Sequence, residues 1–166
     1  MKLAAILFAV ALCGCSSIPV SHGIPNLQVI DSRAMICCGG TPNEGGRQVL
    51  KAMGVRYFLN LDTVPDPVLD GVTMVHIPIT GYQQQFGLVG SQLEAAYAFM
   101  LAHPGAVYVH CKHGMNRTRT FVALWRMRHD GWSWQRAVAE ANEFGWGSSF
   151  EALKEAVRGQ YPVYAK

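Results

Sequence analysis

The sequence predicts an α/β protein with a central, mainly parallel sheet of about four to five strands flanked by helices. Strand-like and helix-like patterns alternate along the chain, and this order favours parallel strands with helices on both faces of the sheet. The chain of 166 residues suffices for one domain, and half of its residues are hydrophobic while 15% are charged. This composition is typical of a globular protein. The formal charge of +3 is too small to indicate a nucleic-acid partner by itself.

Apolar stretches bounded by turn residues predict the strands. They lie at 33–38, 55–61, 73–79 and 106–110. The segment between the second and third stretches contains two prolines, and the segment 80–90 is rich in glutamine and glycine, so both are predicted loops.

Capping signals and helical spacing predict the helices. At the first helix Thr41 can cap, Pro42 suits the first turn, Glu44 closes a capping box and Gly54 ends the helix. The other predicted helices are 91–103, 118–129, one that begins at Ser133, and one that runs from Ser148 to about Arg158.

The first residues resemble a bacterial export signal. Lys2 precedes an unbroken apolar run that is shorter than a transmembrane helix requires. The sequence LCGC at its end resembles the lipobox of bacterial lipoproteins, which implies cleavage before Cys15 and lipidation of that residue. We therefore expect a signal peptide at 1–14, a lipidated and poorly ordered tether at 15–26, and one folded domain at 27–166. Ordinary secretion with cleavage nearby is the alternative.

This reading predicts a location in the bacterial cell envelope. The protein would face the periplasm and contact the membrane through its lipid anchor. Ser16 follows the lipidated cysteine, where an aspartate would usually signal retention in the inner membrane, so the outer membrane is slightly favoured.

The stretch HCKHGMNRT lies between the last predicted strand and the long helix after it. Its side chains therefore emerge at the carboxyl end of a parallel strand, where open α/β sheets bind ligands. A loop that leads into a helix presents free N–H groups, which suit an oxyanion and favour a thiolate at Cys111. Arg117 can hold two phosphate oxygens, and Thr118 can donate its hydroxyl to the cysteine sulfur. Gly114 permits the turn, and His110 is expected to orient the loop.

The spacing His-Cys-x5-Arg-Thr resembles the signature of the cysteine-dependent protein tyrosine and dual-specificity phosphatase superfamily. The stretches 37–62 and 110–140 resemble the opening and the active-site helices of small dual-specificity phosphatases, so the likeness covers most of 34–160. The resemblance implies a phosphotyrosine-phosphatase-like fold and a phosphocysteine mechanism in which Cys111 attacks phosphorus and Arg117 holds its oxygens. The implied phosphate-binding residues are Lys112, His113, Gly114, Met115, Asn116 and Arg117.

The general acid is the part of the family pattern that is not evident. The family usually carries an acidic residue on the loop after the strand that here is 73–79, yet 80–90 contains neither Asp nor Glu. Asp62 follows the strand 55–61, so it is the candidate acid, whereas Asp66 and Asp70 lie further along the same loop. Further departures from the family are Cys38, Asn116 and Arg119.

The remaining cysteines form no evident disulfide framework. Besides Cys111 the predicted domain contains only Cys37 and Cys38, and neighbouring cysteines rarely pair with each other. Cys38 stands where relatives hold an arginine, and a reversible Cys38–Cys111 disulfide is a hypothesis for regulation.

The sequence leaves several functions open. The predicted function is hydrolysis of phosphate monoesters; the alternative is a phosphate- or phosphoinositide-binding module with impaired turnover, and thiol-based arsenate reduction is a third. We expect a phosphorylated protein or inositol phosphate as substrate, no nucleic-acid partner, no metal, no cofactor and a monomer. His110, Cys111 and His113 are too close together on one loop for tetrahedral metal geometry.

Overall fold

The structure is a computed structural model that describes residues 22–80, 86–146, 154–155 and 157–158. The strands are β1 (Gln28–Asp31), β2 (Ile36–Gly40), β3 (Tyr57–Asn60), β4 (Thr73–His76) and β5 (Val107–Cys111). The helices are α1 (Glu44–Ala52), α2 (Phe86–Ala102), α3 (Asn116–Arg128) and α4 (Trp134–Glu143). Residues 154–155 and 157–158 are also helical.

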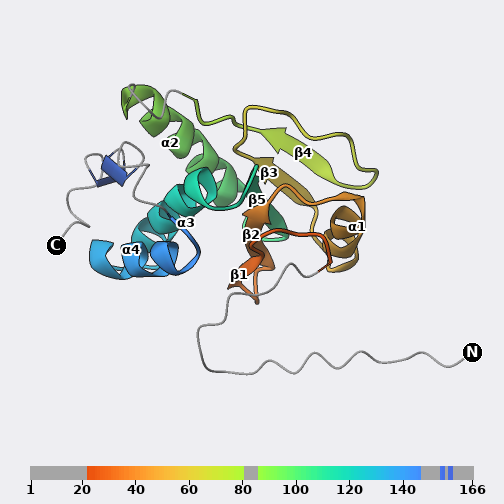
Figure 1. Cartoon of the computed structure of the whole chain (residues 1–166), viewed down its shortest axis with the longest axis horizontal. Helices are drawn as coiled ribbons and strands as arrows, with labels where there is room; N and C mark the ends of the chain where they lie inside the picture. Colours follow the sequence, from red (N-terminus) through yellow and green to blue (C-terminus); the bar gives the residue numbers. More distant parts are fainter. Residues whose placement is uncertain (1–21, 81–85, 147–153, 156, 159–166) are drawn as a thin grey trace, which may run out of the picture.

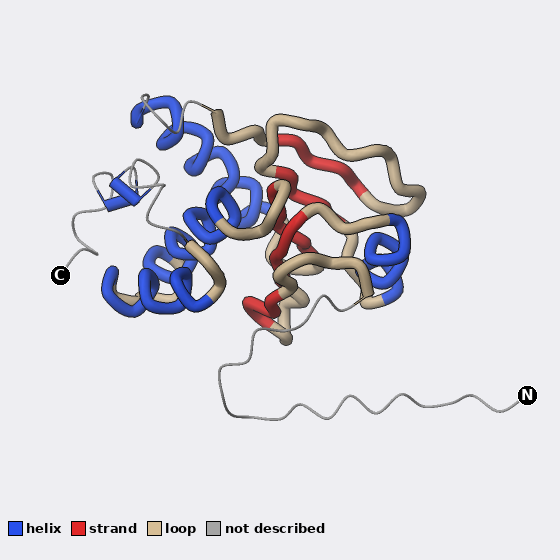
Figure 2. Tube along the Cα trace, in the orientation of Figure 1, coloured by secondary structure: helices blue, strands red, loops and turns tan. Residues whose placement is uncertain are grey.

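The five strands form one sheet in the order β1-β2-β5-β3-β4. The pairs β2–β5, β5–β3 and β3–β4 are parallel, whereas β1 pairs antiparallel with β2 at the edge. Figure 2 shows the strands gathered in the middle of the molecule, with helices on both sides. The predicted fold class is therefore confirmed, including its mainly parallel sheet.

Helices cover both faces of the sheet. Helix α1 lies on one face, and α2, α3 and α4 lie on the other (Figure 1). Successive strand residues point to opposite faces, so Phe58 joins the apolar cluster under α1 while Leu59 joins the cluster under the other helices. Burial on both faces explains why the central strands are apolar without alternation.

Helix α1 begins later than the sequence predicted. Its N-cap is Asn43, whose side chain accepts a hydrogen bond from the backbone N–H of Gly46, so the prediction of Thr41 as the cap is wrong. The Thr41 hydroxyl instead donates to the carbonyl of Cys111, and its N–H donates to the carbonyl of Lys112. Thr41 thus binds carbonyl groups far along the chain and does not cap the helix that follows it.

Helix α2 and strand β1 also differ from the expectation. Helix α2 begins at Phe86, within the segment 80–90 that was predicted to be a loop. Strand β1 was not predicted, because four residues at a sheet edge carry too short a pattern. The predicted start of the last helix at Ser148 lies outside the described residues.

The folded domain begins before residue 27. Ile24 is fully buried, the carbonyl of Gly23 accepts the N–H of Asn43, and the carbonyl of Pro25 accepts the N–H of Gly40. The expectation of a poorly ordered tether that reaches Asn26 is therefore wrong for its last residues. Residues 1–21, with the predicted signal peptide and Cys15, lie outside the described part. Within the described part, no helix combines the length and the apolar character needed to cross a bilayer.

Candidate active site

Cys111 is the last residue of β5, and a loop of four residues connects it to α3. In the register of the sheet, Cys111 lies opposite Gly40 of β2, and the preceding residue lies opposite Asn60 of β3. The cysteine thus stands at the carboxyl edge of the sheet, between the ends of two parallel strands. The structure agrees here with the strand–loop–helix unit that the sequence predicted.

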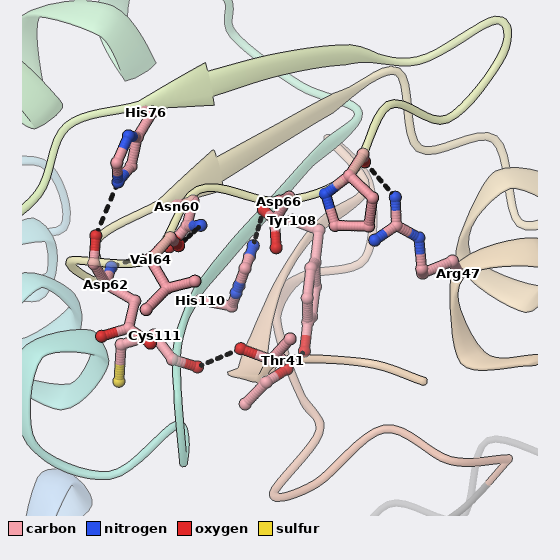
Figure 3. A network of polar contacts seen from close by, with 12 residues as sticks. Thr41, Arg47, Asn60, Asp62, Val64, Asp66, His76, Tyr108, His110 and Cys111 are labelled. Carbon is pink, nitrogen blue, oxygen red and sulfur yellow. Dashed lines mark hydrogen bonds and ion pairs between the residues drawn. The ribbon is translucent and has the colours of Figure 1, made fainter. Parts of the chain in front are cut away.

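The loop makes a tight turn at Gly114. Its φ is +73°, and a Cβ atom there would lie 2.3 Å from the carbonyl carbon of Gly39 and 2.4 Å from the nitrogen of Gly40. Only glycine fits both the left-handed backbone and this close approach to β2. The carbonyl of Cys111 accepts the Thr41 hydroxyl at 3.4 Å on the same side (Figure 3).

The N-terminus of α3 has no side-chain cap among the described residues. Met115 occupies the N-cap position and makes no capping hydrogen bond with its side chain, while its carbonyl accepts the N–H of Arg119 at 3.3 Å. N–H groups in the first turn of a helix lack intrahelical partners and, with the helix dipole, favour a bound anion.

Arg117 is held by two contacts from neighbouring segments. Its Nε donates to the carbonyl of Ile79 at 2.9 Å, and its Nη1 donates to Oδ1 of Asp62 at 3.0 Å. The same carboxylate oxygen accepts the N–H of Thr63 at 2.8 Å. Asp62 therefore reaches the site, as the sequence suggested, but its observed contact is an ion pair with the guanidinium.

Asp62 is itself fixed by the end of β3 and by β4. Its N–H donates to Oδ1 of Asn60 at 2.7 Å, and its carbonyl lies 2.7 Å from Nε2 of His76 (Figure 3). Asn60 and His76 were not predicted as site residues, because only the pairing of β3 with β4 brings them to the same place.

Thr118 is fully buried behind the loop. Its hydroxyl donates to the carbonyl of Gly39 at 3.3 Å, whereas the sequence predicted donation to the cysteine sulfur. In this structure Thr118 therefore links α3 to the end of β2.

His110 makes a contact that the sequence did not predict. Its Nε2 lies 2.8 Å from Oδ2 of Asp66, and the histidine side chain is fully buried in this pair (Figure 3). Its ring stacks on Tyr108, with centroids 5.4 Å apart. Asp66, which the sequence only placed on the loop after Asp62, thus links the segment after β3 to the residue before Cys111.

The rest of the loop faces solvent to differing degrees. Lys112 and His113 are exposed, while Met115 and Asn116 are partly buried. The side-chain oxygen of Asn116 is buried and has no hydrogen-bond partner among the described residues.

A cavity of about 460 Å³ opens beside the loop. Its lining combines threonines, prolines and a valine with three charged side chains: Thr41, Asp62, Thr63, Val64, Pro65, Asp66, Pro67 and Lys112. The segment after β3 forms most of this wall, and Asp66 holds that segment against His110. A ligand bound at the loop could extend into this cavity.

All three cysteines of the described residues are buried, Cys111 at the end of β5 and the other two within β2. Cys37 and Cys38 are buried in β2, and burial raises the pKa of the Cys37 thiol to about 12 and that of the Cys38 thiol to about 11. Both are free thiols in the described structure, as is Cys111. In the hypothetical disulfide with Cys111, Cys38 would therefore have to react from a thiol that holds its proton strongly.

The sheet register argues against a Cys38–Cys111 disulfide. Cys38 lies opposite Val109, whereas Cys111 lies opposite Gly40, which is two positions further along β2 than Cys38. With the usual strand spacing and rise, the two Cα atoms are roughly 8 Å apart, beyond the ~7 Å that a disulfide spans without backbone movement. The sulfur of Cys38 instead lies 3.2 Å from Nη1 of the buried Arg119. The hypothesis of this disulfide is therefore disfavoured.

Within the described residues, no group of three or more His, Cys, Asp or Glu side chains could hold a metal ion.

The fold of the chain is similar to that of solved structures. The five-stranded sheet with its flanking helices is the phosphotyrosine-phosphatase-like fold, and solved phosphatases share it. Human DUSP28 aligns with a TM-score of 0.68 and 21% identity over 84% of this chain and 95% of that one. The core catalytic domain of the Saccharomyces cerevisiae PP-IP phosphatase SIW14, in complex with citrate, aligns with a TM-score of 0.64 and 17% identity over 80% and 85%.

One relative is similar in both sequence and structure. The chain is 43% identical over 56 residues to the dual specificity protein phosphatase TpbA of Pseudomonas aeruginosa, a match that covers 34% of this chain but only 23% of the relative. The structure of TpbA with pTyr aligns with a TM-score of 0.61 and 24% identity over 84% of this chain and 91% of that one. No family model matches the chain. The short sequence match and the structural alignment together make the chain similar to this phosphatase.

Proposed function

We propose that the protein is a phosphatase that hydrolyses phosphate monoesters through a phosphocysteine intermediate on Cys111. One observation carries the proposal: the cysteine ends the central strand β5, and a loop of four residues leads from it to α3, whose N-cap makes no side-chain capping hydrogen bond and whose second residue is Arg117. A nucleophile, N–H groups and a guanidinium then surround one small space, as transfer of a phosphoryl group requires.

The reaction has two steps in this arrangement. The Cys111 thiolate attacks phosphorus, an S–P bond forms, and the P–O bond to the leaving group breaks. Water then attacks the phosphocysteine, the S–P bond breaks, and inorganic phosphate and the thiolate are released. The N–H groups of the loop and the guanidinium of Arg117 stabilise the charge on the phosphate oxygens in both steps.

Asp62 remains the proposed candidate for the general acid, and its contact with Arg117 suggests a second role. A carboxylate that accepts the guanidinium at 3.0 Å can orient it for the phosphate oxygens. An acid must instead carry a proton to the leaving oxygen. The two roles differ in their dependence on the leaving group, so a series of esters separates them.

The alternative function is a phosphate-binding module without turnover. Two observations favour it: the sequence 80–90 has no acidic residue, and Asp62 is already engaged by Arg117. The binding features of the loop serve both functions equally. Turnover by the native protein therefore decides between them.

The relatives suggest substrates to test. TpbA has been crystallised with pTyr, and SIW14 is a PP-IP phosphatase. For this chain we propose a phosphorylated protein or an inositol phosphate as substrate, with its remaining part in the cavity beside Lys112. Steady-state assays against aryl phosphates, phosphopeptides and inositol phosphates measure this preference.

The experiment that tests the function uses Cys111→Ser. A serine hydroxyl is a far weaker nucleophile than a thiolate, so we expect turnover of an aryl phosphate to disappear while vanadate binding largely persists. Cys37→Ser is the matched control, because that thiol lies in β2 away from the loop. Substantial turnover by Cys111→Ser would contradict the mechanism, and binding without turnover in the native protein would favour the alternative.

We also propose that the protein is anchored to the periplasmic face of a bacterial membrane through a lipid on Cys15. The sequence LCGC at 12–15 supports this proposal. Fractionation of cells that express the full chain and its Cys15→Ala variant tests it. Release of the variant, but not of the native protein, into the soluble fraction is the expected result.

A further inference from the structure

Three successive carbonyl groups of the cysteine loop are bound by residues outside it. The carbonyl of Cys111 accepts the hydroxyl of Thr41 at 3.4 Å, and the carbonyl of Lys112 accepts the N–H of Thr41 at 3.1 Å. The carbonyl of His113 accepts Nδ2 of Asn26 at 2.8 Å. These donors come from the segment after β2 and from the segment before β1.

The three contacts set the direction of the N–H groups in the same stretch. The peptide unit is planar, and in its trans form the carbonyl and the following N–H point in opposite directions. The described chain contains no cis peptide bond. The N–H groups of Lys112, His113 and Gly114 therefore point away from Asn26 and Thr41. Successive N–H groups on one side of a loop make a concave binding site for an anion.

Asn26 is fixed by its own backbone. Its φ is +51°, in the left-handed region that asparagine tolerates better than most residues. Its carbonyl accepts Nη2 of the fully buried Arg119 at 2.8 Å. The carbonyl of the preceding Pro25 accepts the N–H of Gly40 at 2.7 Å. The exposed side chain of Asn26 thus contributes no core packing, yet it is aimed at the loop.

We propose that Asn26 is a positioning residue of the phosphate site. By holding the carbonyl of His113 outward, it keeps the loop N–H groups turned towards a bound phosphate even when the site is empty. Thr41 does the same for the two preceding carbonyls. This role rests on the proposed phosphatase function, and it acts on phosphate through the loop backbone without contact between Asn26 and the substrate.

Two substitutions in the full-length protein isolate this role. Asn26→Gly keeps the left-handed backbone but removes the donor. Asn26→Asp keeps the shape of the side chain, but its carboxylate cannot donate to the carbonyl of His113. Gln135→Glu is the matched control, because it makes the same charge change at an exposed position of α4, on a different element from Asn26.

The measurements are vanadate affinity, kcat and KM for an aryl phosphate, and Tm. For Asn26→Gly we expect the vanadate dissociation constant to rise about five- to tenfold with Tm nearly unchanged, since the donor bonds only a loop carbonyl. For Asn26→Asp we expect the vanadate dissociation constant to rise about tenfold or more, because a negative charge is also added near the anion site. Gln135→Glu should have the same vanadate affinity, kcat, KM and Tm as the native protein.

Each outcome decides something different. Native affinity and turnover in both Asn26 variants would overturn the role of Asn26 and leave the phosphatase proposal standing. A fall in Tm that accounts for the lost activity would assign Asn26 to general stability and would also overturn it. A native protein that neither binds vanadate nor hydrolyses esters would overturn the proposed function together with this inference. Weakened vanadate binding without native turnover would support the positioning role within a binding module.

Discussion

Two neighbouring strand–loop–helix units, β2–α1 and β5–α3, have the same topology and different chemistry. Their strands are parallel, and Gly40 at the end of β2 lies opposite Cys111 at the end of β5. The N-cap of α1 is Asn43, whose side chain accepts the N–H of Gly46. The N-cap of α3 is Met115, whose side chain caps no N–H in the described structure.

The first-turn arginines of the two helices differ in the same way. Arg47 of α1 is buried and donates to the carbonyl of Pro67, so it fastens a loop. Arg117 of α3 is partly exposed and faces the carboxylate of Asp62 beside the cysteine. The comparison shows that α1 has a side-chain cap at its N-terminus and that α3 has none among the described residues, as the proposed anion site at α3 requires.

The largest expected effect comes from Gly114→Ala in the β5–α3 unit. The new Cβ would collide with the backbone of β2 at a position of positive φ, so we expect a loss of about 3 kcal/mol in the free energy of unfolding or failure to fold. Phosphatase activity should fall at least about a thousandfold, because the loop cannot keep its shape. Urea unfolding and kcat/KM measure the two effects.

Gly45→Ala in α1 is the matched control for that substitution. Its nearest contact is an ordinary 3.5 Å to the side chain of Asn43. Alanine is favoured over glycine in helices by ~1 kcal/mol, so the variant should be as stable as the native protein or slightly more stable, and fully active. A tolerated Gly114→Ala variant would contradict the described geometry.

The second prediction contrasts the thiols of the two units. Burial raises the pKa values of Cys37 and Cys38 above the usual value, so both stay protonated as the pH rises through 8. At that pH about one thousandth or less of each is the reactive thiolate. We expect iodoacetamide at pH 8 to modify Cys111 and to leave the β2 thiols unmodified in the folded protein, as mass spectrometry of peptides would show.

Denaturation provides the control for the alkylation experiment. All three thiols should react at similar rates in concentrated guanidinium, because the folded surroundings of each thiol are lost. Preferential modification of Cys38 in the folded protein would overturn the contrast between the units.

The third prediction concerns the partner of Arg117. Asp62→Asn keeps a hydrogen-bond acceptor but removes the charge, so we expect kcat/KM to fall on the order of tenfold. The fall should be similar for aryl and alkyl esters if Asp62 orients Arg117. Measurements over a series of leaving groups test this, with Asp70→Asn as the control on the same loop. A much larger loss for alkyl esters would instead make Asp62 the general acid.

The smallest effect is expected from Asn43→Ala at the cap of α1. Loss of an N-cap side chain typically costs ~1 kcal/mol, and the α1 unit carries no proposed chemistry. We expect a corresponding decrease in the urea midpoint with unchanged kcat/KM. Ser133→Ala at the cap of α4, where Oγ accepts the N–H of Arg136 at 3.3 Å, should behave alike. Strong loss of activity in Asn43→Ala alone would show that the two units are coupled.

The sequence predicted those parts of the molecule that depend on local patterns. The parallel sheet, the helix after Cys111 and the turn at Gly114 follow from short runs of apolar residues and from one glycine. The sequence placed Asp66 on the loop after the strand 55–61 and gave it no role, yet it binds His110 across 44 positions. Asn26 was assigned to a tether, yet it binds His113 across 87 positions. Contacts of this kind depend on which strands become neighbours in the sheet, and a local sequence pattern does not predict that order.

The position of β5 in the sheet order has a consequence for hydrogen exchange. Strand β5 is paired on both sides, by β2 and by β3, whereas β1 and β4 lie at the edges. Amides of a doubly paired, buried strand open only when much of the domain opens, so those of Val107–Cys111 should be among the slowest to exchange with deuterium. The cysteine thus ends the strand whose amides we expect to open last.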